Sequence, residues 1–539
     1  MKRHWALAAL LACATALLLA FAWQEGLASV SDDSASYLVL AQAMAGGNPA
    51  VLPWVGYHTH FPPLFPLALA LTGGAADFRN AHALVALFTA VGALLAYVFA
   101  WRETGRRDAA FALAVAFLAC PTTWVSAKGI LSEPMFLCAS MATLLYFQGR
   151  FERGEPQPRH WLALGLLLAA TVLTRVVGTA LVLALLVHLV VRARRGGKLP
   201  GAAALAAALV PPALLVLGWI ALRPMAAQDS YQRVSTSMAH SWSASTGVME
   251  RVSARTILDG WTASFTADAN VGAVGASVAL VVAALALAGL VRRLLANRLD
   301  AWYAAVSLVV IGWWVFNEDN TRRLLLPLLP LLLFYAGEAI VAACRRAHRA
   351  AYATHAVAAA GALLALVILP AAVVMGRKAF DREPVVAGFA PRYADMTEYY
   401  TTLNASFSRR LAARQAVILA GFDALRQHTP AGAKVMWMRP EYPALLGGRV
   451  GVPYYYDWDP MHVARAARDQ NVDYLVSTPL FKSDLAGAKG DPAKPLAGVE
   501  AWTRPVMALA NPGARSADFV LLEVDRAALA AWIAGRGAS

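Results

Sequence analysis

The sequence is poor in charged residues. Only 15% of its 539 residues are Asp, Glu, Lys or Arg, whereas 59% are hydrophobic and the mean hydropathy is +0.52. Soluble globular proteins average about 25% charged and roughly 45–50% apolar residues. This deficit of charge excludes an intrinsically disordered chain and an ordinary water-soluble one. It indicates a protein whose solvent is mostly lipid.

Cysteine is also scarce. The four cysteines, Cys13, Cys120, Cys138 and Cys344, lie in or at the ends of apolar runs and have no metal-ligand spacing. We therefore expect no disulfide in the segments outside the membrane. The sequence also lacks a glycine-rich phosphate loop, an HExxH motif and a GxSxG motif. The most familiar nucleotide-binding, zinc-protease and serine-hydrolase signatures are thus excluded.

Long apolar runs are abundant instead. A helix needs about 17–25 apolar residues to cross the hydrocarbon core of a bilayer. The candidate runs are 5–23, 81–101, 109–125, 134–148, 161–174, 176–191, 201–222, 272–291, 301–316, 324–343 and 353–375. The stretch 161–191 is too long for one crossing, and Arg175 in its middle would be costly at the bilayer centre, so we predict a helical hairpin there. Residues 1–375 thus form a polytopic α-helical domain of about 11 transmembrane helices.

Positive charge is distributed unevenly along the chain, whose formal net charge is +14. If the N-terminus is cytoplasmic, the N-terminus and the inner loops together carry 18 Lys/Arg and five acids. The short outer connections carry four Lys/Arg. The inner loops are 102–108, 149–160, 192–200, 292–300 and 344–352. Since Lys and Arg mark the cytoplasmic side, we expect a multi-pass protein of the cell (inner) membrane with residues 376–539 on the extracytoplasmic, periplasmic side. The positive net charge is then explained by the membrane topology and does not indicate nucleic-acid binding.

The first apolar run allows a second interpretation. A basic N-terminus and small residues near Ala28 are typical of a cleaved secretory signal. The uncharged stretch 5–23 is longer than a usual signal core of about 7–15 residues, which favours a retained helix. In either case residue 30 begins outside.

Three long segments are expected on the outer face, namely 24–80, 223–271 and 376–539. Aromatic residues in the first two, such as Trp54 and Trp242, are typical of segments along a membrane interface. In the third, helices and strands alternate: helix 409–428, strand 434–438, a turn or short helix at 441–447, strand 449–456, helix 460–470, strand 472–477, strand 518–524 and helix 526–534. This alternation predicts a C-terminal extracytoplasmic α/β domain that caps the membrane domain or recruits an acceptor.

Two adjacent acids, Asp32 and Asp33, follow the first apolar run. Asp33 suits the N-cap of an amphipathic helix that places Tyr37 and Leu40 on one face. Capping explains one acid and not two. Carboxylates held at a bilayer surface are suited to proton abstraction, so we interpret this pair as a candidate functional site.

A second polar patch contains His58 and His60, followed by Pro62 and Pro63. Two histidines at i and i+2 on a strand face the same way and are compatible with a metal site, although two ligands alone are weak evidence. The alternative is structural, because a Pro-Pro pair fixes an extended backbone and suits a rigid re-entry into the membrane.

Further polar residues at the predicted outer ends of helices are Lys128, Glu133, Arg175, Arg322 and Arg323. Glu133 precedes a proline and suits the first turn of a helix, where the helix dipole favours an acid. The arginines run against the expected charge distribution, and their guanidinium groups are suited to bidentate phosphate binding. The structural alternative is contact with lipid head groups.

The order of these features resembles a known family. The segments DDSASYLVLAQAMAGG, FPPLFPLALAL, SEPMF, LTRVVG and RRLLLPLLPLLL, followed by an outer α/β domain, are similar to the GT-C membrane glycosyltransferases. Within them the resemblance is to protein O-mannosyltransferases and lipid A aminoarabinose transferases. The resemblance implies an inverting enzyme that takes a sugar from a polyprenyl-phosphate carrier at the outer membrane face and passes it to an acceptor.

The family's Asp-Glu-x-x-Tyr pattern falls on residues 33–37 of this chain. The resemblance implies that Asp33 is catalytic and that Tyr37 belongs to the site. Ser34 stands where the family has Glu, and Asp32 is a candidate to compensate. Phe61 stands where many relatives of the lipid A enzyme have Lys before Pro-Pro, so His60 or Lys128 would have to make that phosphate contact. The substrate-binding candidates are Asp32, Tyr37, His58, His60, Lys128, Glu133, Arg175, Arg322 and Arg323.

One essential carboxylate is consistent with this chemistry. Phosphate is a good leaving group when Arg or Lys stabilises its charge, so no strong general acid is needed. The acceptor hydroxyl does need to lose a proton, and Asp33 is the best-placed base. A glycosidase typically uses two carboxyl groups on opposite sides of the bond, which adjacent aspartates do not provide.

The expected partners are a polyprenyl-phosphate-linked sugar donor, a lipid, polysaccharide or protein acceptor, and membrane lipids, with no nucleic acid. No cofactor is required by the sequence, and the participation of a divalent metal stays open. A secondary transporter and a non-enzymatic envelope-assembly protein are the alternatives. A transporter would show internal repeats and charges deep within paired helices, whereas here the polar residues gather at helix ends.

Overall fold

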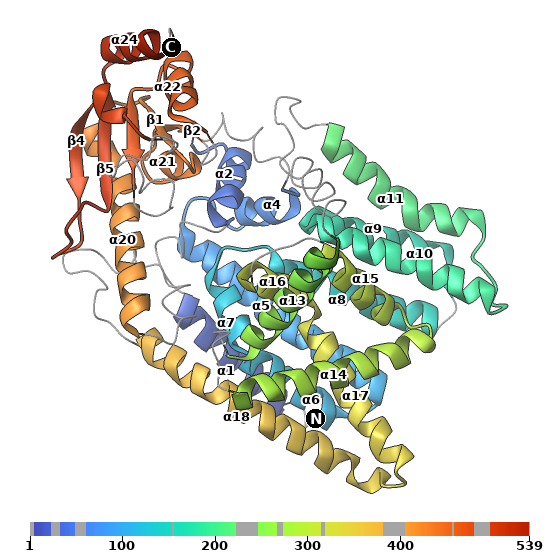
Figure 1. Ribbon diagram of the computed structural model, residues 1–539. Coiled ribbons are helices and arrows are strands. Elements are labelled where there is room, and N and C mark those ends of the chain that lie inside the picture. Colours follow the sequence, from blue (N-terminus) through green and yellow to red (C-terminus); the bar gives the residue numbers. More distant parts are fainter. Residues whose placement is uncertain are drawn as a thin grey trace.

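The architecture is mostly helical, with a small sheet near the C-terminus (Figure 1). The computed structural model describes residues 5–22, 33–48, 61–153, 156–221, 246–266, 273–313, 318–380, 405–454, 458–478 and 496–537. The helices of the bundle are α1 (Trp5–Ala22), α5 (Phe78–Thr104), α6 (Arg107–Ala119), α7 (Pro121–Lys128), α8 (Glu133–Phe147), α9 (Pro158–Thr174), α10 (Thr179–Arg194), α11 (Ala202–Ala221), α14 (Ala273–Leu295), α15 (Leu299–Trp313), α16 (Glu318–Leu325), α17 (Leu329–Arg346) and α18 (Ala353–Phe380). The long predicted loops contribute α2 (Ser34–Ala45), α4 (Leu64–Leu71) and α13 (Thr246–Thr266).

Each of the eleven predicted apolar runs coincides with a helix or a pair of helices. Among the described residues, six helices are long and apolar enough to cross a membrane, or seven if the bent pair α6 and α7 counts as one span. Helices α1, α9 and α15 are apolar but shorter. The chain is therefore a multi-pass membrane protein by composition and structure, while the number of eleven crossings stays a prediction.

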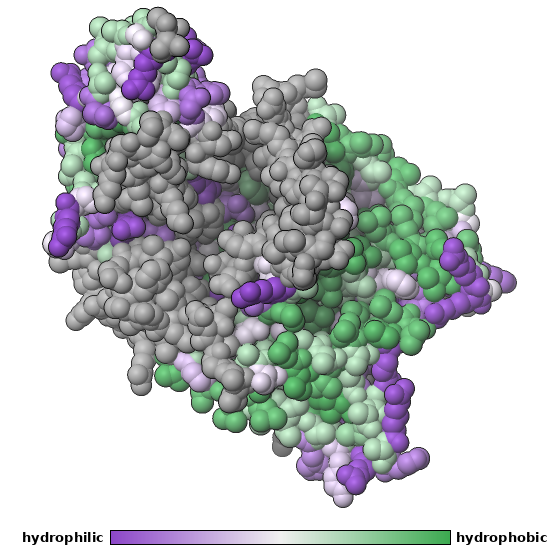
Figure 2. Space-filling model, viewed as in Figure 1, coloured by the Kyte–Doolittle hydropathy of each residue, from purple (hydrophilic) through white to green (hydrophobic). Residues whose placement is uncertain are grey.

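The surface of the bundle fits a lipid environment. Large apolar side chains are exposed on neighbouring helices, among them Leu166 of α9, Leu183 of α10 and Leu214 of α11. Figure 2 shows hydrophobic residues over the bundle and hydrophilic ones at its lower right end and on the C-terminal region. An apolar surface of this extent is not stable in water and marks contact with a membrane.

Two predicted segments differ in detail from the expectation. The run 109–125 is not one helix, because α6 ends before Cys120 and α7 begins at Pro121, with a bend of 57° between them. Proline disfavours the helical conformation at the residue before it, and Cys120 is extended, with φ −64° and ψ 127°. The predicted break at Arg175 is confirmed, since this residue is extended between α9 and the short helix η4 (Val176–Gly178).

The C-terminal region is an α/β unit, as the alternating pattern predicts. Its elements are α20 (Ala405–His428), β1 (Lys434–Trp437), α21 (Glu441–Leu445), β2 (Val450–Pro453), α22 (Pro460–Asp469), β3 (Tyr474–Ser477), β4 (Thr503–Leu509), β5 (Phe519–Val524) and α24 (Arg526–Gly537). The strand order is β2-β1-β3-β5-β4, with β1 parallel to β2 and β3, and β5 antiparallel to β3 and β4. Strand β4 escaped the sequence-based prediction because Pro505 and a register shift interrupt its pattern.

Helix α2 joins the two parts of the molecule. It packs against α4 on one side and against α21 on the other, and all three belong to one hydrophobic core with the sheet. Asn48, just after α2, donates a hydrogen bond to the Ala444 carbonyl of α21 at 3.2 Å. The expectation of an amphipathic helix is therefore wrong, because residues 34–41 are buried on every face. Helix α2 thus lies between the bundle and the C-terminal region.

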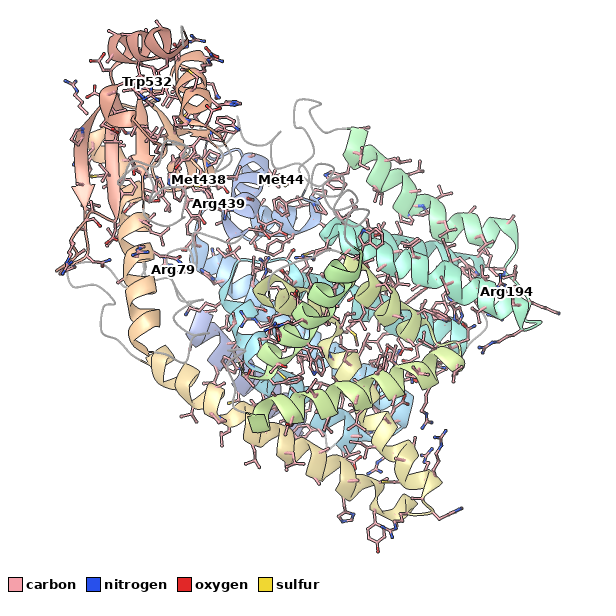
Figure 3. The ribbon with its side chains drawn as sticks, viewed as in Figure 1. Met44, Arg79, Arg194, Met438, Arg439 and Trp532 are labelled. Carbon is pink, nitrogen blue, oxygen red and sulfur yellow. The ribbon has the colours of Figure 1, made fainter. Side chains whose placement is uncertain are left out.

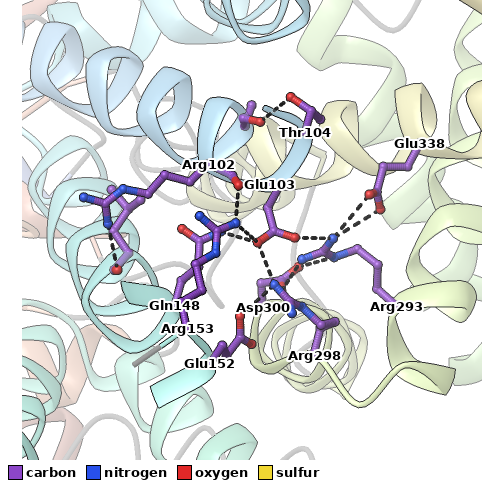
Figure 4. Close-up of polar contacts among 12 residues, drawn as sticks. Arg102, Glu103, Thr104, Gln148, Glu152, Arg153, Arg293, Arg298, Asp300 and Glu338 are labelled. Atoms are coloured by element: carbon purple, nitrogen blue, oxygen red, sulfur yellow. Dashed lines mark hydrogen bonds and ion pairs between the residues drawn. The ribbon is translucent and has the colours of Figure 1, made fainter. Parts of the chain in front are cut away.

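A cluster of ion pairs lies beyond the C-terminal end of α8. Arg293 pairs with Glu103 at 2.9 Å and with Asp300 at 2.7 Å, and Arg298 pairs with Glu103 at 2.6 Å and with Glu152 at 2.7 Å (Figure 4). These residues come from predicted inner loops and are separated from Glu133 by the 15 residues of α8, about 22 Å of helix. The cluster fixes the ends of α5, α14 and α15 together.

Helices α14 and α17 lie in close contact at Gly289. A Cβ at this position of α14 would lie 2.1 Å from the Tyr335 carbonyl oxygen of α17, whereas a Cβ at Gly337 on α17 would meet nothing within 4 Å. We predict that Gly289→Ala forces the helices apart and lowers the free energy of unfolding by about 1–3 kcal/mol. Gly337→Ala is the matched control and should change it little. Denaturation by SDS titration measures both, and equal effects would contradict the packing argument.

The buried cluster also gives a stability prediction. Glu103 and Arg293 are each 7% exposed, so Glu103→Gln leaves the buried Arg293 and the partly exposed Arg298 with one charged partner fewer. The expected loss in the free energy of unfolding is about 3–5 kcal/mol. Asp108→Asn removes an exposed partner of Arg106 and should cost roughly 0–1 kcal/mol in the same SDS titration. If Glu103→Gln lowered the free energy of unfolding as little as Asp108→Asn does, the cluster would not contribute to stability.

Candidate functional site

Asp33 occupies the N-cap position of α2 without acting as a side-chain cap. Its carboxylate makes no capping hydrogen bond. Instead, Oδ2 accepts a hydrogen bond from Nη2 of Arg323 at 3.0 Å. The side chain is 39% exposed, so a reactant can reach it. The capping interpretation of this side chain is therefore wrong, and its carboxylate is directed at an arginine 290 positions away.

Glu133 lies on the other side of the same arginine. It is in the first turn of α8, after Ser132, and is 1% exposed. Its Oε1 accepts from Nε of Arg323 at 3.0 Å and pairs with Nη1 of Arg175 at 3.0 Å. The other oxygen, Oε2, is buried without a hydrogen-bond partner among the residues that the structure describes. One carboxylate oxygen thus links two guanidinium groups.

Arg175 reaches the site because the chain is broken there. It is the extended residue between α9 and η4, so its side chain projects from a helix end and not into lipid. Nη1 also donates to Oγ of Ser132 at 2.9 Å, and that hydroxyl is 2.8 Å from the Tyr37 hydroxyl. Tyr37 is enclosed by Phe61 and Phe65, whose ring centroids lie 4.9 and 5.0 Å from its own. The Tyr37 hydroxyl thus belongs to the polar site, while its ring packs against two aromatic side chains.

Arg323 is positioned by α16, which packs against α13. At Gly260 of α13 a Cβ would lie 3.0 Å from the backbone nitrogen of Arg322, so the two helices approach closely. With α16 held in this way, the Arg323 side chain is 18% exposed and spans the gap between Asp33 and Glu133.

A third arginine faces Asp33 from the C-terminal region. Arg439 lies between β1 and α21, and its charge acts on Asp33 together with those of Arg323 and Arg175. Burial raises the pKa of the Asp33 carboxyl, but the charge and hydrogen bond of Arg323, helped by Arg439 and Arg175, outweigh burial and leave the pKa below the usual value of 3.8. Asp33 is thus ionised at neutral pH. Burial raises the pKa of Tyr37, so its hydroxyl keeps its proton.

Five of the predicted site residues form one hydrogen-bonded set with Ser132, namely Asp33, Tyr37, Glu133, Arg175 and Arg323. Lys128, at the end of α7, and Arg322, on α16, are buried side chains of neighbouring helices. Asp32, His58 and His60 lie outside the described residues.

Two members of the site escaped the sequence-based prediction. Ser132 sits inside the quoted segment SEPMF, and its place next to Glu133 was the available signal. Arg439 has no motif, and only the packing of α21 on α2 brings it close to Asp33.

The carboxylates that the structure describes at the site are paired with arginine. Among the described residues no group of three or more His, Cys, Asp or Glu is placed to hold a metal ion. The two carboxylates are instead bridged by the guanidinium of Arg323. The local counter-charge is therefore supplied by arginine.

A helical bundle with this site at the end that meets an α/β region is the fold of the GT-C membrane glycosyltransferases. The apo structure of ArnT from Cupriavidus metallidurans matches with a TM-score of 0.52 at 14% identity, covering 97% of this chain and 98% of that one. The same protein bound to undecaprenyl phosphate matches with a TM-score of 0.50 at 15% identity, covering 96% and 98%. The oligosaccharyltransferase of Archaeoglobus fulgidus, tethered with an acceptor peptide, matches with a TM-score of 0.50 at 11% identity, covering 96% and 74%.

The family comparison agrees with this fold. Residues 56–199 match the model of the dolichyl-phosphate-mannose-protein mannosyltransferase family. No curated protein matches the sequence. The matched segment contains Glu133 and Arg175, whereas Asp33 and Arg323 lie outside it. The chain therefore shares the fold of these solved structures, and its residues 56–199 are similar in sequence to the mannosyltransferase family.

The arginine pairing predicts the titration of Asp33. Arg323→Gln removes a positive charge and a hydrogen bond from Asp33 and should raise the pKa of its carboxyl. The charged carboxylate would then be lost at a higher pH than in the unaltered protein. Infrared difference spectroscopy of the carboxyl band, assigned with Asp33→Asn, measures this. Arg79→Gln removes a partner of Asp77 in the same loop and should leave the band of Asp33 unmoved. An unchanged titration in Arg323→Gln would refute the pairing.

Proposed function

We propose that the protein is an inverting glycosyltransferase that moves a sugar from a polyprenyl-phosphate carrier to an acceptor of the cell envelope. The acceptor is a glycolipid, a polysaccharide or a protein. The reaction takes place at the outer face of the inner membrane, with the N-terminus cytoplasmic. The observation that carries the proposal is the Asp33 carboxylate, exposed and paired with Arg323 beside Glu133 and Arg175.

The arginines are suited to the donor. A polyprenyl-phosphate sugar is a phosphodiester, and its leaving phosphate gains negative charge as the bond to the sugar breaks. Arg175 and Arg323 donate from two helix ends and stabilise that charge where it develops. The ArnT structure with undecaprenyl phosphate supports a lipid phosphate as the ligand of such a fold.

Asp33 is the base in this proposal. The acceptor oxygen attacks the anomeric carbon from the side opposite the phosphate, and its bond forms as the bond from that carbon to the phosphate oxygen breaks. The electron pair leaves with the polyprenyl phosphate, and the acceptor proton passes to Asp33. Attack from the opposite side inverts the anomeric configuration.

Donor binding activates this base. While Arg323 is hydrogen-bonded to Asp33, the low pKa makes the carboxylate a weak proton acceptor. A donor phosphate competes for the Arg323 guanidinium, and its own negative charge raises the pKa of Asp33. The base thus becomes stronger when the sugar is in place.

The test is a deletion strain complemented with the full-length chain. Its envelope should contain a component that lacks one sugar by mass spectrometry and regains it with the unaltered gene. Asp33→Asn should reduce that transfer at least a hundredfold, within the range of about 10²–10⁴ for a lost general base. Asp77→Asn, which removes the negative charge of an N-cap residue in the same outer loop, should retain transfer. Full complementation by Asp33→Asn would refute the function.

A further inference from the structure

The charges of the site alternate along a line that crosses from the bundle to the C-terminal region. Arg175 pairs with Glu133, Glu133 with Arg323, and Arg323 with Asp33, at distances of 2.9–3.0 Å. Arg439 comes from the C-terminal region, where α21 packs against α2, and it pairs with Glu441 at 2.9 Å. The positive charge near the proposed base thus comes from the bundle and from the C-terminal region.

Arg439 is built into its place. Nε and Nη2 both bond Oε1 of Glu441, at 3.0 and 2.9 Å, and the guanidinium lies 5.6 Å from the ring centroid of Tyr442. The next residue, Pro440, crosses so close over β2 that a Cβ at Gly451 would lie 1.9 Å from its carbonyl oxygen. The side chain is 19% exposed. The ion pair and the aromatic contact thus hold the mostly buried Arg439 side chain in one place.

Its location in the sheet is that of a ligand-binding residue. Arg439 lies two residues beyond the end of β1, the middle one of three parallel strands, and ligands of open α/β sheets bind beyond the carboxyl ends of such strands. This edge is directed at α2, because α21 packs against that helix. Figure 3 labels Arg439 where the C-terminal region meets α2 and the bundle.

The reaction geometry decides which substrate meets Arg439. Resting on the proposed function, the donor phosphate binds Arg175 and Arg323, and in an inverting reaction the acceptor arrives from the side opposite that phosphate. We propose that Arg439 binds an acidic group of the acceptor, a phosphate or a carboxylate, close to the oxygen that becomes glycosylated. The C-terminal region would then select anionic acceptors in addition to covering the site.

The first arm of the test identifies the acceptor and the effect of the charge. In the complemented deletion strain, the component that regains its sugar should carry a phosphate or carboxylate next to the modified position, read by tandem mass spectrometry. Arg439→Gln should lower transfer at least tenfold, and Arg439→Lys should retain more of it because the charge is kept. Arg504→Gln, which alters an exposed ion pair of Glu523 on β4, is the matched control and should complement fully.

The second arm separates acceptor from donor. Binding of undecaprenyl phosphate to the purified full-length chain in nanodiscs should be weakened at least tenfold by Arg323→Gln and less than twofold by Arg439→Gln. Retained binding also shows that Arg439→Gln is folded. If Arg439→Gln weakens this binding as much as Arg323→Gln does, Arg439 serves the donor and the inference is wrong.

Further outcomes are equally decisive. The inference is overturned if the acceptor is neutral or if Arg439→Gln gives full transfer. The proposed function survives either result, provided that Asp33→Asn does not restore transfer. If Asp33→Asn itself complements fully, the proposed function fails, and the inference fails with it.

Discussion

The guanidinium of Arg323 is the contact on which the arrangement of the site depends. It is shared by two carboxylates from distant parts of the chain, Asp33 before α2 and Glu133 at the start of α8. Without a cation between them these acids would repel each other and one would take up a proton. The same group holds α16 against the first loop. In the proposed reaction, a phosphate that binds Arg323 competes with both acids for the same guanidinium.

The opposite end of α8 is held by a different kind of charge cluster. Glu103, Arg293, Arg298 and Asp300 bind one another with few groups exposed, and their role is to fix helix ends. At the candidate site, by contrast, Asp33 is 39% exposed. The two ion networks thus differ in one carboxylate: Glu103 and Asp300 are buried, whereas Asp33 is partly exposed, as the proposed reaction requires.

Much of this could be predicted from residue patterns. The apolar runs identified the helices, Arg175 marked a break, and the acids and arginines at helix ends gave four members of the candidate site, while the family pattern gave Tyr37. What escaped prediction depends on contacts between distant segments. Arg439 follows an ordinary strand, and nothing near it in sequence indicates that α21 packs on α2. The bend at Pro121 was visible as a proline, but its size depends on how α6 and α7 pack.

The burial of α2 between two parts of the chain also has a consequence for synthesis. The hydrophobic core that encloses Tyr37 and Leu38 includes Trp437, Leu475 and Phe519, which are translated hundreds of residues later. Contacts of such sequence separation form late, because the intervening chain must be ordered first. Helix α2 therefore gains these contacts only after the C-terminal region has been translated and folded. A chain that ended before the sheet would leave α2, and Asp33 just before it, without this packing.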